Sequence, residues 1–154
     1  MRMTQQTDYA LRMLIYLALR GDAGCTVSEV ANAYDLSRNH LLKVARRLSQ
    51  MGVVTTERGR SGGIALARAP EEITLGAVVR EMEESFALVA CMGGGATRCA
   101  LNPACRLRGV VAEALDAYLA VFDRYSLADL VAERSALAGL LGLALEPPAA
   151  PALN

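Results

Sequence analysis

Residues 26–66 of the chain read TVSEVANAYDLSRNHLLKVARRLSQMGVVTTERGRSGGIAL, and they contain the strongest structural signals in the sequence. Thr26-Val-Ser-Glu29 has the form of a capping box, in which a hydroxyl and a carboxylate each satisfy a free backbone N–H, and it predicts a short helix. A turn at residues 34–36 follows, and Ser37 is expected to cap a second helix with one apolar face. This order predicts a helix-turn-helix unit.

A β-hairpin is predicted directly after this unit. Residues 53–56 and 63–66 are short β-prone runs on either side of residues 57–62, Glu-Arg-Gly-Arg-Ser-Gly. Because that intervening segment is basic and rich in glycine, it can form a compact tip that lies against a narrow groove. The hairpin therefore has the position and the charge of a wing.

Two further helices complete the predicted domain. Apolar residues recur at helical spacing between residues 5 and 20, and Thr74 begins another helix that is expected to run to about Glu84. The predicted fold class is mainly α with a small β-hairpin wing. We assign residues 1–84 to a winged helix-turn-helix DNA-binding domain.

The distribution of charge supports contact with nucleic acid. The chain has 16 basic and 16 acidic residues, so its formal net charge is zero, yet residues 38–68 hold seven basic residues and one acidic residue. Phosphate contacts need clustered Lys and Arg side chains, not a high overall pI. The polar face of the second helix carries Arg38, Asn39, Lys43, Arg46 and Arg47.

In a winged helix-turn-helix the second helix enters the major groove, and the wing reaches the backbone or the minor groove. Arg38 can pair with guanine, Asn39 with adenine, and Lys43 with phosphate. The sequence thus predicts double-stranded operator DNA as a partner. The candidate DNA-binding residues are Ser37, Arg38, Asn39, His40 and Lys43 in the helix and Arg58 and Arg60 in the wing.

A long helix is predicted near the C-terminus, with Asn102 and Pro103 as its cap and first-turn proline and an end at about Arg124. It would be about 33 Å long, which is more than the remaining chain can cover. We therefore expect it to pair with a second subunit in a homodimer. A helix inside an intramolecular bundle would have the same pattern.

The last part of the chain divides into a helix and a tail. Ser126 is expected to begin a final helix that ends at about Leu143. We assign residues 103–143 to the dimerisation helices. Residues 144–154, which are rich in proline and alanine, are expected to be a disordered tail.

Three of the four cysteines, Cys91, Cys99 and Cys105, fall in a predicted loop of residues 85–106, and Cys25 lies elsewhere. A disulfide framework does not suit an odd cluster in a chain without a recognisable signal sequence, so we expect reduced thiols and a cytoplasmic location. Zinc sites favour cysteines with two to four residues between them, and here seven and five intervene. Iron–sulfur clusters accept wider spacing, which favours them.

The composition excludes one class of protein. Hydrophobic residues make up 53% of the chain and charged residues 21%, and no uninterrupted apolar run approaches the roughly 20 residues that span a bilayer. We expect no membrane partner.

An enzyme with Cys105 as its nucleophile is also disfavoured. Such an enzyme would need a base near Cys105, and the single histidine, His40, lies on the helix predicted to face DNA.

Six short motifs carry a resemblance to a known family. They are Thr7-Asp-Tyr-Ala-Leu-Arg12, Ser37-Arg-Asn-His40, Arg58-Gly-Arg-Ser-Gly-Gly-Ile64, Val78-Val-Arg-Glu81, Pro103-Ala-Cys-Arg-Leu107 and Tyr125-Ser-Leu-Ala-Asp-Leu-Val131. Together they resemble the NsrR/IscR family of iron–sulfur winged-helix regulators, and within it the nitric-oxide-sensing NsrR repressors. The resemblance extends from about residue 1 to about residue 140.

The resemblance implies a homodimeric bacterial repressor that binds operator DNA while an iron–sulfur cluster is intact and releases it on cluster nitrosylation, with nitric oxide as the signal. The implied ligands are Cys91, Cys99 and Cys105 together with Asp8 of the partner subunit, and a 4Fe–4S cluster is favoured over a 2Fe–2S cluster. An oxygen ligand is harder and more labile than a thiolate, so it would leave one iron open to nitric oxide.

Within this family, IscR-like members use a histidine shortly after the third cysteine. Here Arg106-Leu-Arg108 follows, which favours the NsrR branch. The interval from Met92 to Arg98 is longer than is usual in the family and leaves the cluster type open. The alternatives are an IscR-like iron–sulfur or redox regulator and a cluster-free thiol- or zinc-dependent DNA-binding regulator.

Overall fold

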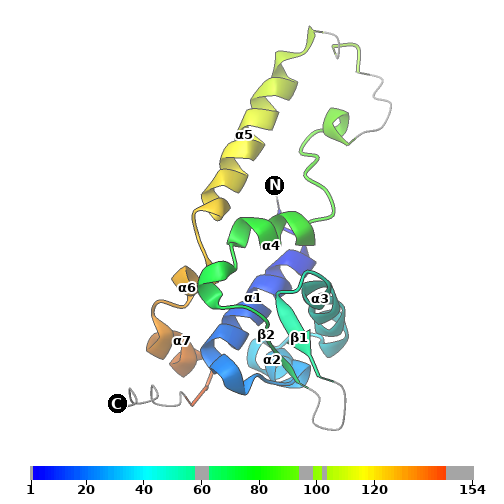
Figure 1. Ribbon diagram of the computed structural model, residues 1–154. Coiled ribbons are helices and arrows are strands. Elements are labelled where there is room, and N and C mark those ends of the chain that lie inside the picture. Colours follow the sequence, from blue (N-terminus) through cyan, green and yellow to red (C-terminus); the bar gives the residue numbers. More distant parts are fainter. Residues whose placement is uncertain (1, 58–62, 94–98, 102–103, 145–154) are drawn as a thin grey trace.

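The computed structural model describes residues 2–57, 63–93, 99–101 and 104–144, and within them the chain is mainly helical with a two-stranded antiparallel sheet (Figure 1). This architecture confirms the predicted fold class. The helices are α1 (Gln5–Arg20), α2 (Val27–Tyr34), α3 (Arg38–Gln50), α4 (Leu75–Met82), α5 (Arg106–Asp123), α6 (Leu127–Leu130) and α7 (Arg134–Leu140). The 3-10 helices are η1 (Gly21–Ala23), η2 (Pro70–Glu72) and η3 (Ala90–Met92), and the strands are β1 (Val54–Thr56) and β2 (Ile64–Leu66).

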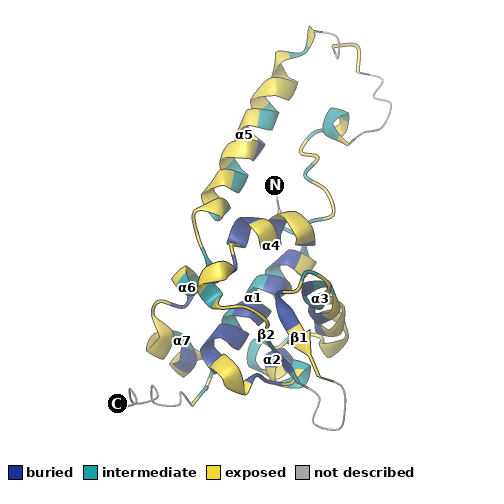
Figure 2. Ribbon diagram, viewed as in Figure 1, coloured by how far each residue is buried: buried dark blue, intermediate teal, exposed yellow. Residues whose placement is uncertain are grey.

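Helix α1 runs through the body of the molecule and supplies the centre of its core (Figure 2). Leu14 and Leu17 are completely buried and belong to one cluster with Leu41 and Leu48 of α3 and Val78 of α4. Burying each such side chain contributes about 1.5–3 kcal/mol. The cluster therefore holds α3 and α4 against α1 and fixes the direction of α3.

The segment between α5 and α6 is tied to the start of α4 by its backbone. The amide of Leu75 donates to the carbonyl of Tyr125 at 2.9 Å, and the amide of Leu127 donates to the carbonyl of Ile73 at 2.8 Å. These two bonds attach the C-terminal helices to the winged domain.

Helix α5 projects away from the body, and only its C-terminal end is anchored there (Figure 1). Among its side chains only Leu115 is classed as buried. At the anchored end, Arg80 Nη2 of α4 donates to Asp123 Oδ2 at 2.7 Å. None of the described helices combines the length and the apolar character that a membrane span needs.

One helix end differs from its predicted position. Helix α4 ends at Met82 and not at Glu84, because Glu83 adopts an extended conformation from which its carboxylate accepts a bond from the Thr4 amide at 2.8 Å. Helix α5 begins at Arg106, with Cys105 as its N-cap residue. Its predicted start at residues 102–103 lies outside the described residues.

The predicted final helix is broken in two. A capping box of Ser126 and Asp129 begins α6, as the sequence indicates, but Val131 leaves the helical conformation after a single turn. The break allows Arg134, at the start of α7, to donate to the carbonyls of Ala18 at 2.8 Å and Leu19 at 2.7 Å. These carbonyls lie in the last turn of α1, where a cation is favoured by the helix dipole. The predicted tail beyond residue 144 lies outside the described residues.

Candidate nucleic-acid interface and cysteine segment

The turn between α2 and α3 follows local signals. Thr26 Oγ1 accepts from the Glu29 amide at 3.2 Å, and the Thr26 amide donates to Glu29 Oε2 at 2.7 Å, so the predicted capping box is confirmed. Asp35 ends α2 in the left-handed conformation, with φ 51°. Ser37 occupies the N-cap position of α3, but its side chain makes no capping hydrogen bond, so the predicted capping role of its hydroxyl is wrong.

Helix α3 presents its polar face to solvent while its apolar stripe is buried. Arg38 Nε donates to Ser28 Oγ of α2 at 3.0 Å, which draws this guanidinium toward the start of α2. The His40 ring stacks on Tyr9 of α1, with ring centroids 6.4 Å apart. All candidate DNA-binding residues of this helix and its cap are exposed, namely Ser37, Arg38, Asn39, His40 and Lys43.

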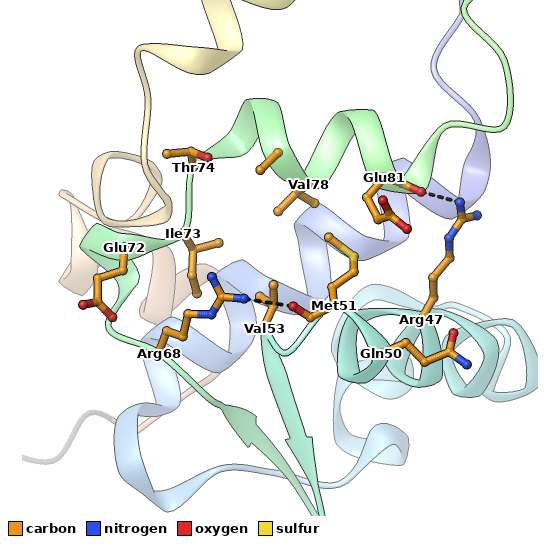
Figure 3. A pocket seen from close by; sticks show the side chains of 11 residues that line it. Arg47, Gln50, Met51, Val53, Arg68, Glu72, Ile73, Thr74, Val78 and Glu81 are labelled. Carbon is orange, nitrogen blue, oxygen red and sulfur yellow. Dashed lines mark hydrogen bonds between the residues drawn. The ribbon is translucent and has the colours of Figure 1, made fainter.

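Arg46 and Arg47 are neighbours in sequence but face different surroundings. Arg46 is exposed, whereas Arg47 Nη1 donates to the carbonyl of Met82 at 3.3 Å. Arg47 Nη2 donates to the carbonyl of Glu81, as Figure 3 shows. The assignment of Arg47 to the basic face is therefore wrong. The last carbonyls of α4 lack intrahelical partners, and they attract a cation within reach. In the sequence, the one local indication that Arg47 turns toward the protein is its position three residues after the buried Val44, on the same side of the helix.

A pocket of about 490 Å³ lies between the end of α3, the wing and α4, and Arg47 lines it (Figure 3). On its other side, Arg68 donates to the carbonyls of Gly52 at 3.0 Å and Met51 at 2.9 Å. Both guanidinium groups hold backbone carbonyls where chain segments meet. The pocket is therefore a structural junction, and the charges of Arg47 and Arg68 do not belong to the α3 face.

The wing is anchored by the loop that precedes α2. The Cys25 amide donates to the Ile64 carbonyl at 2.9 Å, and the Ile64 amide donates to the Cys25 carbonyl at 2.7 Å. Burial raises the pKa of the Cys25 thiol to about 12, and the nearby Glu29 carboxylate adds to the shift. Cys25 is thus a buried, protonated thiol of the core. Arg58 and Arg60 lie outside the described residues.

The other three cysteines lie along the segment between α4 and α5, and all three are free thiols. Cys91 is in η3, Cys105 precedes α5, and both are half-buried, whereas Cys99 is exposed. Soft thiolates of this kind fit an iron–sulfur cluster chemically. In the part of the chain that the structure describes, no three Cys, His, Asp or Glu side chains gather closely enough to hold a metal. The described residues thus supply the ligand types without gathering them into one site.

Asp8 lies in the first turn of α1, paired with Arg12. Asp8 Oδ1 accepts from Arg12 Nε at 3.1 Å, and Asp8 Oδ2 lies 3.0 Å from Arg12 Nη2. The Arg12 guanidinium also lies over the Tyr34 ring, 5.9 Å from its centroid. Since the Asp8 side chain is 43% exposed, another molecule can reach its carboxylate.

The start of α1 contacts the segment that leads to the cysteines. The Thr4 amide donates to Glu83 Oε1 at 2.8 Å, and Gln6 Nε2 donates to Glu84 Oε1 at 3.2 Å. These residues are 79 and 78 positions apart in the sequence, so no local pattern could reveal the contact. The helix that carries Asp8 and the segment that carries Cys91 are thereby connected within one chain.

Comparisons with known proteins agree with this geometry. The chain is 49% identical over 144 residues to the HTH-type transcriptional regulator NsrR of Halalkalibacterium halodurans, covering 93% of this chain and 99% of that protein. It is 46% identical over 142 residues to the protein of the same name from Bacillus subtilis, covering 92% and 97%. Among solved structures it resembles CymR, the global cysteine regulator of B. subtilis, with a TM-score of 0.67, 25% identity and coverage of 86% and 98%.

The family model Rrf2, described as an iron-dependent transcriptional regulator, matches residues 3–133. This match spans the winged domain, the cysteine segment and α5, which are the parts that the structure joins. The chain therefore belongs to the Rrf2 family of transcriptional regulators, which are DNA-binding proteins and not enzymes.

Proposed function

We propose that this regulator is a nitric-oxide-responsive repressor, which binds operator DNA as a homodimer while an iron–sulfur cluster is intact. The observation that carries the proposal is the position of the three free cysteines. They lie between α4, which closes the winged domain, and α5, which projects from it. A change at the cysteines can thus alter how the two parts are held. Nitric oxide as the signal rests on the resemblance of the six motifs to the NsrR branch, with which the names of the relatives agree.

The proposed DNA surface is the exposed face of α3 together with the wing. Asn39 and Lys43 lie on the open side of α3, where an amide can pair with adenine and an ammonium with phosphate. The free Ser37 hydroxyl and the exposed His40 lie at the start of the same helix. Arg58 and Arg60 are proposed to contact DNA from the wing tip.

The proposed ligands are Cys91, Cys99 and Cys105 of one chain and the partner subunit's Asp8. Cys25 is no candidate, because its raised pKa keeps the buried thiol protonated. The Asp8 carboxylate is paired with Arg12, and it keeps lone pairs on the exposed side with which it could bind iron. When bound, the cluster would supply an iron atom that reacts with nitric oxide. We favour a 4Fe–4S cluster over a 2Fe–2S cluster, because the resemblance to the NsrR branch implies it.

The chain's own contacts offer a route from this site to the DNA surface. Glu83 holds the start of α1 next to the cysteine segment, and Arg47 holds the last carbonyls of α4 from α3. A displacement of residues 81–93 would therefore reach both α1 and α3. Such a displacement changes DNA affinity only if the two arrangements differ in their affinity for DNA.

The proposed dimer contact is a stripe of exposed apolar residues on α5. The residues alternate at intervals of three and four, which is the spacing of a two-helix seam. Leu107 and Val110 are each 61% exposed, and Val121 is 44% exposed. Leu115, which is buried, does not belong to this stripe. Its members are Leu107, Val110, Ala114, Ala117 and Val121.

The test is a Cys99→Ala variant purified under anaerobic conditions, with Cys25→Ala as the matched control. We expect the variant to lose bound iron and sulfide, visible absorbance and most of its affinity for operator DNA at moderate salt, because a thiolate ligand is gone. The control keeps all of these properties. Nitric oxide titration of the wild type should bleach the absorbance and release DNA in parallel.

The same measurements separate the alternatives. Zinc without sulfide in the wild-type protein would show a zinc-dependent regulator. Retention of colour and DNA affinity by Cys99→Ala would show that the cysteine segment is not the sensor.

A further inference from the structure

Helix α3 carries an exposed leucine in the middle of its charged face. Leu42 is 39% exposed, whereas Leu41 and Leu48 of the same helix are completely buried. Arg38 and Arg46 lie four residues before and after Leu42, so the three side chains lie along one stripe of the helix. A single exposed leucine needs no explanation by itself. The place of Leu42 between two guanidinium groups gives it a specific setting.

Leu42 lines a hollow of about 540 Å³ between α3 and the base of the wing. Arg38 and Arg46 also line this hollow, and Glu57 is the acidic residue among its lining side chains. The bond from Arg38 to Ser28 draws the Arg38 guanidinium to the α2 side of the hollow. The apolar end of Leu42 is therefore left open between two positive charges.

The positive charge around Leu42 indicates which kind of molecule binds there. A second protein that covered Leu42 would also have to satisfy two guanidinium groups, whereas duplex DNA presents phosphates on both sides of a groove that contains base edges. The apolar group that bases present in the major groove is the C5-methyl of thymine. A leucine with an arginine one turn before it and another one turn after it can contact such a methyl group while the guanidinium groups reach phosphates of the backbone.

We propose that Leu42 is a specificity-determining residue that contacts the C5-methyl group of a thymine in the major groove of the operator. The inference rests on the proposed DNA-binding function of α3. It adds apolar recognition of one base to the polar contacts assigned to Asn39 and Lys43. It also predicts a preference for a T·A pair at one position in each half-site, related by the two-fold axis of a dimer.

The test uses the full-length chain, purified under anaerobic conditions, and a duplex selected by the wild type from a randomised library. Each thymine of the selected duplex is then replaced by uracil, which removes only the methyl group. We expect one symmetric pair of positions at which uracil weakens wild-type binding about fourfold per site, the size expected for one buried methyl group. Leu42→Ala should bind the thymine and uracil duplexes equally at these positions.

Leu140→Ala is the matched control, because Leu140 is an 84% exposed leucine on α7, away from the hollow. It should keep the full effect of uracil. A second variant, Leu42→Gln, protects the test against a folding defect in Leu42→Ala. Its side chain can pair with adenine, so a new selection should move the preference from thymine to adenine at the same positions.

The possible failures are distinguishable. Wild-type binding that is indifferent to uracil at every thymine would overturn the role of Leu42 and leave the proposed function standing. The same holds if Leu42→Ala keeps the wild-type response to uracil. If the wild type selects no duplex at all, the proposed DNA-binding function of α3 fails, and the role of Leu42 fails with it.

Discussion

Gly76, in the first turn of α4, lies directly beside the ion pair between Arg80 of α4 and Asp123 of α5. A Cβ atom at this position would lie 2.8 Å from Arg80 Nη1 and well inside contact distance of Asp123 Oδ1. The hydrogen bonds from Arg80 hold the pKa of the Asp123 carboxyl below its ordinary value. A glycine here therefore leaves room for the ion pair that joins the projecting helix to the winged domain.

A Gly76→Ala substitution should break this ion pair with little change in stability. The clashing atoms are the ends of flexible, exposed side chains, so they can move away, and the contribution of an exposed pair is small. Alanine also favours a helix over glycine by about 0.5–1 kcal/mol. We expect the free energy of unfolding, measured in urea, to stay within about 1 kcal/mol of the wild type.

Loss of the ion pair in Gly76→Ala can be measured through the pKa of the Asp123 carboxyl. In Gly76→Ala its pKa should rise toward the ordinary value, as measured by NMR. Since the wild-type pKa is depressed, the stabilisation by the pair is present above the ordinary pKa and is lost as the pH falls through the depressed value. Gly109→Ala is the control, because a Cβ there meets nothing within 4 Å. An unchanged Asp123 titration in Gly76→Ala would show that the pair can re-form around the methyl group.

At the scale of elements, α3 separates two adjacent arginines into different roles. Arg46 faces solvent beside Leu42, and Arg47 holds the carbonyls of Glu81 and Met82 at the end of α4. Affinity for DNA depends on salt through the number of phosphates that a protein neutralises. Replacing Arg46 should therefore change the salt dependence of DNA affinity, whereas replacing Arg47 should not.

We expect Arg46→Met to reduce the slope of log affinity against log salt by about one, because one phosphate contact is lost. Arg47→Met should leave that slope unchanged and lower the free energy of unfolding by about 1–2 kcal/mol, because two carbonyls lose a charged donor. The two variants remove the same group from neighbouring positions, so each is the control for the other. Equal changes in slope would mean that Arg47 leaves α4 to bind DNA.

The helices with local signals could be predicted from the sequence. The capping box at Thr26 and the helix start at Ser126 formed as expected, because each depends only on residues three positions apart. The interruption between α6 and α7 could not be predicted from a local pattern, because the contact that it allows, from Arg134 to the carbonyls of Ala18 and Leu19, joins residues more than a hundred positions apart. The end of α4 at Met82 is likewise accompanied by a long-range contact, between Glu83 and Thr4.

The candidate site was predictable in its chemistry but not in its assembly. The spacing of Cys91, Cys99 and Cys105 indicates soft thiolate ligands, and the structure leaves these thiols free. Whether they converge depends on contacts that the sequence does not encode locally, and among the described residues they do not form a metal group. The pairing of Asp8 with Arg12 follows from their i, i+4 spacing on one helix. A ligand from a second chain cannot be derived from such spacing.

At the scale of the whole molecule, α5 divides its apolar residues between two sides. Leu115 is buried, whereas Leu107 and Val110 remain open to solvent. A groove of about 510 Å³ runs between α5 and residues 85–89, and Val110 lines it. The open stripe and the groove lie on the part of the chain that projects from the body. Both would be covered by a second copy related by two-fold symmetry, since the same stripe then meets itself.

A Val110→Glu substitution tests this arrangement. In a symmetric dimer it would place two carboxylates in one apolar seam, which costs about 3 kcal/mol or more and weakens dimerisation by more than about a hundredfold. Sedimentation equilibrium should then find a monomer at concentrations where the wild type is a dimer. Asp116→Lys changes a charge on the same helix but outside the stripe, so this variant should dimerise as strongly as the wild type.

The same variant connects association to the proposed metal site. If the partner subunit's Asp8 is a ligand, a monomer lacks one of the four, so Val110→Glu should retain less iron than Asp116→Lys although its own cysteines are intact. A monomer that keeps its full iron content would exclude the shared ligand without excluding the dimer. A Val110→Glu protein that stays dimeric would instead show that the stripe on α5 is not the contact, and that the copies meet through another surface.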